Sequence, residues 1–155
     1  MRIDEICSHR IVHIRATATL QQAARLMRDE STRALLVTEH TAVGARVVGI
    51  VTDRDMVVHG IASRSDCTET AVSEVMTRGL LTIRDDAVIS EALRLMLSHG
   101  LHRLGVVDRQ QRLVGMLSLD DTIRAMGGEW TLLVGILGRD NFTGAGPRAP
   151  SDLIL

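Results

Sequence analysis

The sequence predicts an α/β fold in which two tandem β-α-β-β-α repeats pack with pseudo-two-fold symmetry. Three observations support this prediction. The chain repeats itself, each copy shows strand-like and helix-like apolar patterns in the same order, and one copy alone is too short to bury a core comfortably. With 155 residues, 45% of them apolar, the chain suits one domain of ordinary size or two half-domains that share a core.

The repeat is visible when the sequence is aligned with itself. A shift of 69 positions aligns residues 5–39 with residues 74–108 without a gap and gives ten identities in 35 positions. After a three-residue difference in one turn, residues 48–55 match residues 114–121 at an offset of 66. These matches indicate a tandem duplication.

Each copy contains the same elements in the same order. A short apolar strand is followed by a helix with apolar residues at helical spacing, and two β-rich runs joined by a turn then lead into a second helix. In the first copy these are the strand 11–14, a helix opened by the candidate N-cap Thr17, the strands 34–38 and 47–51, and a helix from about Asp53. In the second copy they are the strand 80–83, a helix opened by the candidate N-cap Asp86, the strands 104–107 and 113–117, and a helix from Leu119.

The duplication also predicts the domain boundaries. We assign residues 1–61 to the first repeat, 62–73 to a polar surface linker, 74–127 to the second repeat, and 128–155 to a C-terminal helix and flexible tail. The apolar strands of both copies are expected to pack together as one unit with a cleft between them. The C-terminal helix carries an apolar face, which we expect either to form an oligomer contact or to pack over the core of its own chain: Trp130, Leu133, Val134 and Leu137.

Composition excludes several function classes. The net charge of −1 predicts no binding to nucleic acid or to anionic membranes. All 18 basic residues are arginine, so a Schiff-base lysine and a P-loop are both excluded. The segment Met1 to His13 lacks the apolar core of a signal peptide, and no apolar run is long enough to span a bilayer, so we expect a soluble cytoplasmic protein. The two cysteines and the scattered histidines predict neither a disulfide nor a metal site, and no catalytic constellation can be assembled.

The strongest candidate site is a recurrent [ST]-x-x-Asp pattern. Thr52 with Asp55, and Ser118 with Asp121, stand where a strand ends and a helix begins. A hydroxyl, a carboxylate and unpaired helix N–H groups therefore meet at one spot, where the carboxylate can hold a ribose diol and the other groups can hold a phosphate or ribose oxygen. The same residues also fit a helix cap without any ligand, and duplication would copy a cap as faithfully as a binding site.

The order of these motifs resembles the cystathionine β-synthase (CBS) domain, present here as a tandem pair. The resemblance rests on Val75-Met76-Thr77, a helix that ends in Leu-Met, His102 to Asp108, and Gly115 to Asp121, with a second copy upstream, and it covers residues 5–126. Leu36 and Gly105 stand where a proline is common in the family, and Cys7-Ser8 replaces the usual Met-Thr of the first copy.

The resemblance implies a stand-alone regulatory protein without catalytic activity. It implies that AMP, ADP, ATP or S-adenosylmethionine binds in the cleft between the repeats, that no cofactor is required, and that the chain forms a homodimer and acts on an unknown effector protein. The ribose and phosphate role falls on Thr52, Asp55, Ser118 and Asp121. A phosphate-facing role falls on His102 and Arg103, and on Arg33, which aligns with His102.

Two points remain open at this stage. We expect the base to lie among apolar strand residues, with Ile14 and Ile83 as the candidates and Val51 and Leu117 beside them. Ala34 stands where the second copy has Arg103, so the two sites are expected to be unequal. The rival hypothesis is a structural, dimerisation or protein-interaction module that binds no ligand and uses the [ST]-x-x-Asp turns only as caps.

Overall fold

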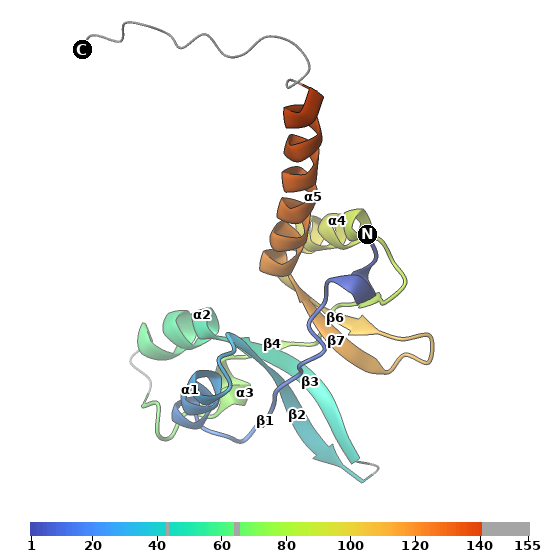
Figure 1. Ribbon diagram of the computed structural model, residues 1–155. Helices are drawn as coiled ribbons and strands as arrows, with labels where there is room; N and C mark the ends of the chain where they lie inside the picture. The colour runs from blue at the N-terminus through green and yellow to red at the C-terminus, as the bar shows by residue number, and fades with distance from the viewer. Residues whose placement is uncertain (43, 64–65, 141–155) are drawn as a thin grey trace, which may run out of the picture.

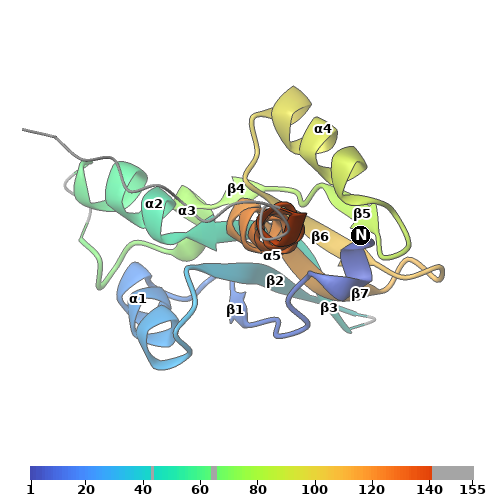
Figure 2. The ribbon, with the colours of Figure 1, turned by 45° about the horizontal axis from the view of Figure 1, so that its top comes forward.

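The computed structural model describes residues 1–42, 44–63 and 66–140 and has a mixed α/β architecture with two sheets (Figures 1 and 2). The first repeat contains the short 3-10 helix η1 (Ile3–Glu5), β1 (His13–Arg15), α1 (Leu20–Asp29), β2 (Ala34–Thr41), β3 (Gly44–Thr52), α2 (Asp53–Asp55) and the π-helical turns η2 (Met56–Ile61). The second contains α3 (Val72–Val75), β4 (Thr77–Arg78), β5 (Thr82–Arg84), α4 (Ile89–His99), β6 (Arg103–Val107), β7 (Leu113–Ser118) and α5 (Leu119–Asp140).

The sheets confirm the predicted β-α-β-β-α order. In each repeat a short strand pairs in parallel with the first hairpin strand, across a helix, and the hairpin itself is antiparallel: β1-β2-β3 and β5-β6-β7. The predicted strand ends lie within three residues of the observed ones. Among the described segments, no helix combines the length and apolarity needed to cross a membrane.

Each repeat has its own apolar core, so the expectation of one shared core is wrong. One cluster is centred on Leu20, Leu35 and Val51, and the other on Leu104, Val106 and Leu117. The two cores are linked in another way: each is completed by a segment from the opposite repeat. Ile3 is fully buried in the second core and Val72 is fully buried in the first.

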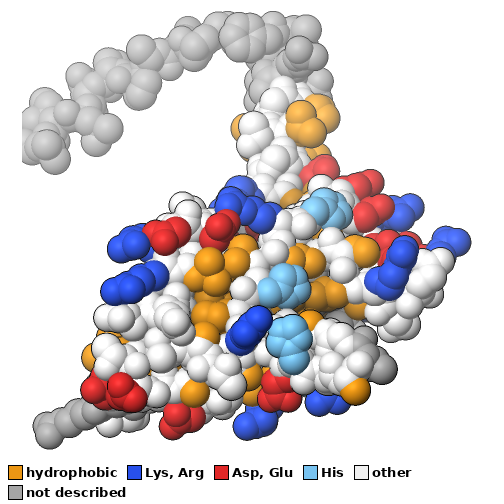
Figure 3. Space-filling model, turned by 90° about the horizontal axis from the view of Figure 1, so that it is seen from below, with side chains coloured by type: hydrophobic (Ala, Val, Ile, Leu, Met, Phe, Trp, Pro, Cys, Tyr) orange, Lys and Arg blue, Asp and Glu red, His pale blue; other side chains and the backbone are white. Residues whose placement is uncertain are grey.

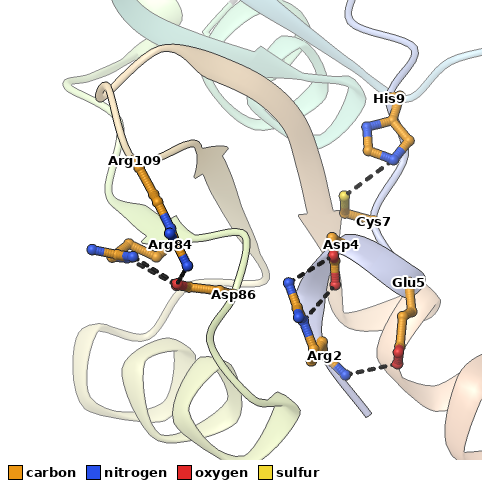
Figure 4. A network of polar contacts seen from close by, with 8 residues as sticks. All are labelled: Arg2, Asp4, Glu5, Cys7, His9, Arg84, Asp86 and Arg109. Atoms are coloured by element: carbon orange, nitrogen blue, oxygen red, sulfur yellow. Dashed lines mark hydrogen bonds and ion pairs between the residues drawn. The ribbon is translucent and has the colours of Figure 1, made fainter.

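The exchanged segments are held by equivalent hydrogen bonds. The N–H of Ile3 donates to the carbonyl of Ala87 at 3.0 Å, and the N–H of Val72 donates to that of Ala18 at 2.7 Å. Ser8 forms an antiparallel bridge with Met116, and β4 pairs with β3 through Thr77 and Ile50. Figure 4 shows the N-terminal segment, with Arg2 and Cys7, lying alongside the second repeat. The repeats are therefore locked together by main-chain pairing.

The predicted helix caps Thr17 and Asp86 are wrong. The N-cap of α1 is Thr19, whose hydroxyl accepts a hydrogen bond from the N–H of Gln22 at 3.2 Å, and α4 begins after Val88 without a side-chain cap. Asp86 is occupied elsewhere, because its carboxylate accepts hydrogen bonds from Nε of Arg84 at 2.9 Å and from a terminal nitrogen at 2.6 Å (Figure 4).

Two segments outside the repeats' sheets differ in their packing. The end of the predicted linker lies against the first repeat, where the carbonyl of Thr70 accepts from the N–H of Leu20 at 3.0 Å. At the other end, α5 continues through Gly127 and Gly128 and stands clear of the body (Figures 1 and 3). The alternative in which this helix packs over its own core is wrong, since Trp130 is 64% exposed. The predicted flexible tail, residues 141–155, lies outside the described residues.

Candidate functional site

The two [ST]-x-x-Asp turns form the same hydrogen-bonded unit in both repeats. At the junction of β3 and α2, Oδ2 of Asp55 accepts from the N–H and the hydroxyl of Thr52, both at 2.8 Å, and the N–H of Asp55 donates to Oγ1 of Thr52 at 3.2 Å. At the junction of β7 and α5, Oδ2 of Asp121 accepts from the N–H of Ser118 at 2.9 Å and from its hydroxyl at 2.6 Å. Both turns are reciprocal capping boxes.

A capping box leaves part of the carboxylate available for other contacts. Both bonds from Ser118 end on Oδ2 of Asp121, while Oδ1 lies 4.0 Å from a guanidinium nitrogen of Arg124 one turn further along α5. Asp121 is only partly buried, so its second oxygen can accept from a ligand hydroxyl while the first holds the cap.

A cavity of about 200 Å³ lies beside the second of these turns. It is lined from both repeats: residues before β1, the turn from α1 into β2, and the junction of β7 with α5. Polar groups and apolar strand residues share its wall: Ser8, Arg10, Ile11, Val12, Ser31, Thr32, Arg33, Ala34, Leu35, Leu36, Ile50, Arg103, Met116, Leu117, Ser118, Asp120, Asp121 and Arg124. Ten of these eighteen residues are polar or charged and eight are apolar, so the wall offers both hydrogen-bonding groups and apolar surface to a small molecule.

Arg33 of the first repeat pairs with a carboxylate of each repeat. Its Nε donates to Oδ2 of Asp53 at 2.9 Å, and another guanidinium nitrogen lies 3.7 Å from Oδ2 of Asp120 at the start of α5. Partial burial would raise the pKa of Asp53, but the hydrogen bond from Arg33, with the N–H of Arg54 and the charge of Arg103, holds that pKa below its ordinary value. The same hydrogen bond raises the pKa of Arg33. This arginine therefore links both helix starts as a permanent cation.

The structure brings five of the predicted site residues to the cavity: Arg33, Arg103, Leu117, Ser118 and Asp121. His102 lines an adjoining pocket, also of about 200 Å³, together with Arg33, Arg103 and Ser118. Thr52 and Asp55 are not among the residues that line the cavity. Ile14 and Ile83 lie at opposite cores, 8% and 6% exposed, because their side chains point to the face of the sheet covered by the helices.

Sequence reasoning missed several residues of the wall. Ser8 and Arg10 reach the cavity because the N-terminal segment crosses to the second repeat, and no local sequence pattern indicates that exchange. Arg124 could have been found from its spacing, since it follows Asp121 by three residues on a helix. Ser31 adopts a left-handed conformation with φ of 51°, where the second repeat has Gly100 with φ of 63°.

The described part of the chain contains no group of three or more His, Cys, Asp or Glu side chains that could hold a metal ion. His99 bonds within its own helix, where its Nδ1 lies 3.1 Å from the carbonyl oxygen of Leu95. The polar groups of the cleft are guanidinium, carboxylate and hydroxyl groups, with the imidazole of His102 in the adjoining pocket.

Comparison with known protein families decides the classification. The CBS domain model matches residues 3–62 and 72–128, which is most of the chain and both repeats. The chain belongs to the CBS domain family. Its two matched regions make it a tandem CBS pair, and its cavity is the cleft of that pair.

Two relatives match most of this CBS pair along most of their own length. The chain is 31% identical over 119 residues to the CBS domain-containing protein YhcV of Bacillus subtilis, covering 77% of this chain and 81% of that protein. It is 28% identical over 125 residues to an uncharacterized 17.7 kDa protein of Acidianus ambivalens, covering 81% and 73% of the two chains. Two further relatives extend beyond the match, and the chain spans 61% and 65% of their lengths.

Solved structures share the fold of the CBS pair. The CBS domain pair of protein MJ0100, in complex with 5′-methylthioadenosine and S-adenosyl-L-methionine, superposes with a TM-score of 0.70 at 22% identity over 83% of this chain and 98% of that one. At that identity the likeness concerns the fold alone. A hexameric CBS-CP12 protein from bloom-forming cyanobacteria gives a TM-score of 0.70 at 26% identity, covering 79% and 69% of the two chains.

Proposed function

We propose that the chain is a cytoplasmic, non-catalytic sensor that binds an adenosine-containing ligand in the cavity beside Asp121. The observation that carries the proposal is that three charged groups line one cavity. The carboxylate of Asp121 uses only Oδ2 in its capping box, and the guanidinium groups of Arg33 and Arg103 come from opposite repeats. The complex of the MJ0100 CBS pair with two adenosyl compounds supports the same ligand class.

The parts of the ligand follow from the wall of the cavity. The ribose hydroxyls bond to the carboxylate of Asp121 and the hydroxyl of Ser118, and the base packs against apolar wall residues such as Leu36, Ile50 and Met116. The phosphate lies toward Arg33 and Arg103, with His102 in the adjoining pocket. The roles first assigned to Thr52 and Asp55 belong to a second, weaker site in this proposal.

The charge of the cavity favours a phosphate over a sulfonium. Four arginines and two aspartates line it, Arg10, Arg33, Arg103 and Arg124 against Asp120 and Asp121, and Arg10 and Arg33 also pair with Glu30 and Asp53 outside the wall. AMP, ADP and ATP carry negative charge, whereas the sulfonium of S-adenosylmethionine is positive. We therefore rank the three nucleotides above S-adenosylmethionine.

Signalling follows from the position of Arg33. A phosphate that binds the guanidinium of Arg33 competes with the carboxylates of Asp53 and Asp120. It therefore weakens the ion pair between Arg33 of the first repeat and Asp120 at the start of α5. The ligand then has different affinities for two arrangements of α5, which is the requirement for a change of shape that a partner protein can read.

The rival function, a ligand-free structural or dimerisation module, is favoured by one observation. Both capping boxes are complete without any ligand, so the [ST]-x-x-Asp turns have a sufficient structural role. The two functions differ in one measurable property, because only the sensor gains stability from an adenosine-containing compound.

The test is a thermal-shift panel of AMP, ADP, ATP, S-adenosylmethionine and 5′-methylthioadenosine. A ligand at a hundred times its Kd adds about 2.7 kcal/mol to the free energy of unfolding. We expect the largest shift with a nucleotide, its loss in Asp121→Asn, and its retention in Asp55→Asn. With one tryptophan and no tyrosine in the chain, carried-over nucleotide is readily seen in the absorbance spectrum of the purified protein. Absence of any shift from nucleotide-free protein would favour the structural module.

A further inference from the structure

Each repeat has a groove between the edge strand of its sheet and the helix that follows that strand, and the two grooves differ in charge. In the first repeat the groove lies between β1 and α1 (Figure 2) and measures about 540 Å³. Its wall, as far as the described residues form it, includes His13 and Arg15 but no carboxylate. In the second repeat the groove between β5 and α4 has two arginines and two carboxylates: Arg84, Arg94, Asp86 and Glu91.

The difference in charge arises at two positions of the duplication. At the offset of 69 residues, Thr17 stands where the second repeat has Asp86, and Gln22 stands where it has Glu91. Thr17 and Gln22 both line the first groove, as Asp86 and Glu91 line the second. Both carboxylates of the second groove therefore have neutral counterparts in the first.

The arginine at the end of the edge strand is present in both repeats but is paired in only one of them. Arg84 donates to the carboxylate of Asp86 from Nε at 2.9 Å and from a terminal nitrogen at 2.6 Å, and Arg109 lies 3.7 Å from the same carboxylate (Figure 4). Its counterpart Arg15 is exposed on β1, and within residues 1–42, 44–63 and 66–140 no carboxylate forms an ion pair with it. The guanidinium of Arg15 therefore has donors available for an anionic group.

The edge of β1 offers main-chain groups beside this arginine. β1 is the outermost strand of its sheet and pairs only with β2. The N–H of Ala16 donates to the carbonyl of Thr38 at 2.9 Å, so every second residue of this segment turns its main chain toward β2, and His13 and Arg15 turn theirs outward. The carbonyl of Arg15 accepts from the N–H of Ala18 at 3.0 Å. The other outward groups can pair with an extended peptide that adds to the sheet as a strand.

The side chains around this edge select the sequence of such a strand. His13 and Arg15 are exposed on one face of β1, whereas Ile14 faces the first core. Residues of an added strand beside Arg15 meet its guanidinium, to which a carboxylate binds through charge-assisted hydrogen bonds. The alternate residues lie over the half-buried Ala18 and Leu26 in the wall of the groove. We propose that the groove between β1 and α1 binds an extended segment of a partner protein in which acidic and apolar residues alternate.

The test uses two labelled six-residue peptides, one alternating glutamate with valine and the other alternating lysine with valine. Fluorescence anisotropy measures their binding to the full chain. We expect only the glutamate peptide to bind, and Arg15→Gln to weaken its binding about tenfold or more, because a charge-assisted hydrogen bond is lost. Arg84→Gln is the matched control and should bind as the wild type does, because Arg84 is already paired with Asp86.

A second pair of variants tests the comparison between the grooves. Thr17→Asp introduces the carboxylate that the second repeat has, which should pair with Arg15 and weaken binding of the glutamate peptide about tenfold. Thr17→Asn has nearly the same shape without the charge, and it should bind the peptide as the wild type does. Thr17 is exposed, so both variants should keep the melting temperature of the wild type.

Three results would overturn the proposal. They are no binding of the glutamate peptide by the wild type at millimolar concentration, equal binding of the two peptides, and equal losses in Thr17→Asp and Thr17→Asn. Vesicles of phosphatidylserine provide a further test, because an anionic membrane also offers negative charge but no strand. Binding of the wild type to these vesicles that is lost in Arg15→Gln would assign the groove to a membrane surface and contradict the proposal.

Discussion

The two [ST]-x-x-Asp turns are nearly identical as local structures but lie in different surroundings. Thr52 and Asp55 form the same reciprocal capping box as Ser118 and Asp121, with bond lengths that differ by at most 0.2 Å. Yet only the second turn lines the cavity that Arg33 and Arg103 share. Duplication preserved the cap, whereas the surroundings of the two turns differ.

The difference arises from residues outside the turns. Where the wall of the cavity has Thr32, the second repeat has the apolar Leu101, which packs against its own core. Where the second repeat has Arg103, the first has Ala34. The second turn therefore shares its cavity with Thr32 and Arg33 of the opposite repeat and with Arg103 of its own repeat.

The largest expected effect concerns the exchanged segments that hold the two repeats together. Ile3→Ala should lower the free energy of unfolding by about 2–5 kcal/mol, because a fully buried side chain leaves a cavity in the second core. Val72→Ala, at the equivalent position in the first core, should cost less, at about 0.8 kcal/mol for each methylene-sized group removed plus the cavity. Urea denaturation measures both, and a larger loss for Val72→Ala would contradict this order.

A second comparison uses two glycines at which the exchanged segments pass close by. A Cβ at Gly49 would lie 2.3 Å from the carbonyl oxygen of Thr77, and one at Gly115 would lie 2.9 Å from that of Ser8. Since main-chain atoms must move to make room, Gly49→Ala should cost about 1–3 kcal/mol or more, and Gly115→Ala less. Equal melting temperatures for the two variants would show that the segments pack more loosely than the structure indicates.

Removal of the two capping hydroxyls, those of Thr52 and Ser118, should affect stability equally but ligand binding unequally. Thr52→Ala and Ser118→Ala should each lower the free energy of unfolding by about 1 kcal/mol, because each removes one N-cap. Only Ser118→Ala should also weaken binding of the nucleotide, because only Ser118 lines the cavity. Thermal melts with and without AMP measure both effects, and an equal loss of binding in the two variants would remove the proposed asymmetry.

The smallest effect is a pH dependence that differs between the hairpin turns. The N–H of Arg112 donates to the Asp108 carboxylate at 2.9 Å, and with the Arg112 side chain and the N–H of Gln110 it lowers the pKa of Asp108. The resulting stability is fully present above the unfolded pKa of about 3.9 and is lost as pH falls through the lower folded pKa. Melting temperatures between about pH 5 and 2 should therefore fall less steeply in Asp108→Asn than in the wild type.

Glu39 is the matched control for this pH dependence. It is the aligned residue of the first repeat and is exposed on β2. Glu39→Gln should leave the slope of melting temperature against pH as it is in the wild type. A slope that is the same in all three proteins would show that the turn of the second repeat does not contribute to acid unfolding.

The repeat and the order of its elements could be predicted from the sequence, because both depend on short-range patterns of apolar residues. The run of apolar strand residues around Leu35 and Leu104 and the helical spacing before Met27 and Met96 are short-range signals, and the structure confirms the strands and helices they predict. The N-cap of α1 was predicted at Thr17, two residues before the observed Thr19. The prediction failed because a turn, in which the N–H of Ala18 donates to the carbonyl of Arg15, precedes the helix.

The composition of the cavity could not be predicted in the same way. Ser8 and Arg10 reach it through the exchange of segments, which depends on long-range main-chain pairing that a single sequence does not reveal. Ile14 and Ile83 were candidates for contact with the base because they lie on the first strands, but each occupies the core face of its strand. Strand alternation decides that face, and it could have been read from the apolar pattern.

The most direct test of the central claim, that the cavity beside Asp121 is the primary ligand site, is a calorimetric titration with AMP. The chain as it stands should bind close to one equivalent per copy with the higher affinity, Asp55→Asn should keep that transition, and Asp121→Asn should lose it. Each variant removes one carboxylate charge from an equivalent capping box, so a difference in binding between them arises from the cavity and not from loss of the cap. Equal binding by both variants, or no heat from protein free of nucleotide, would contradict the account.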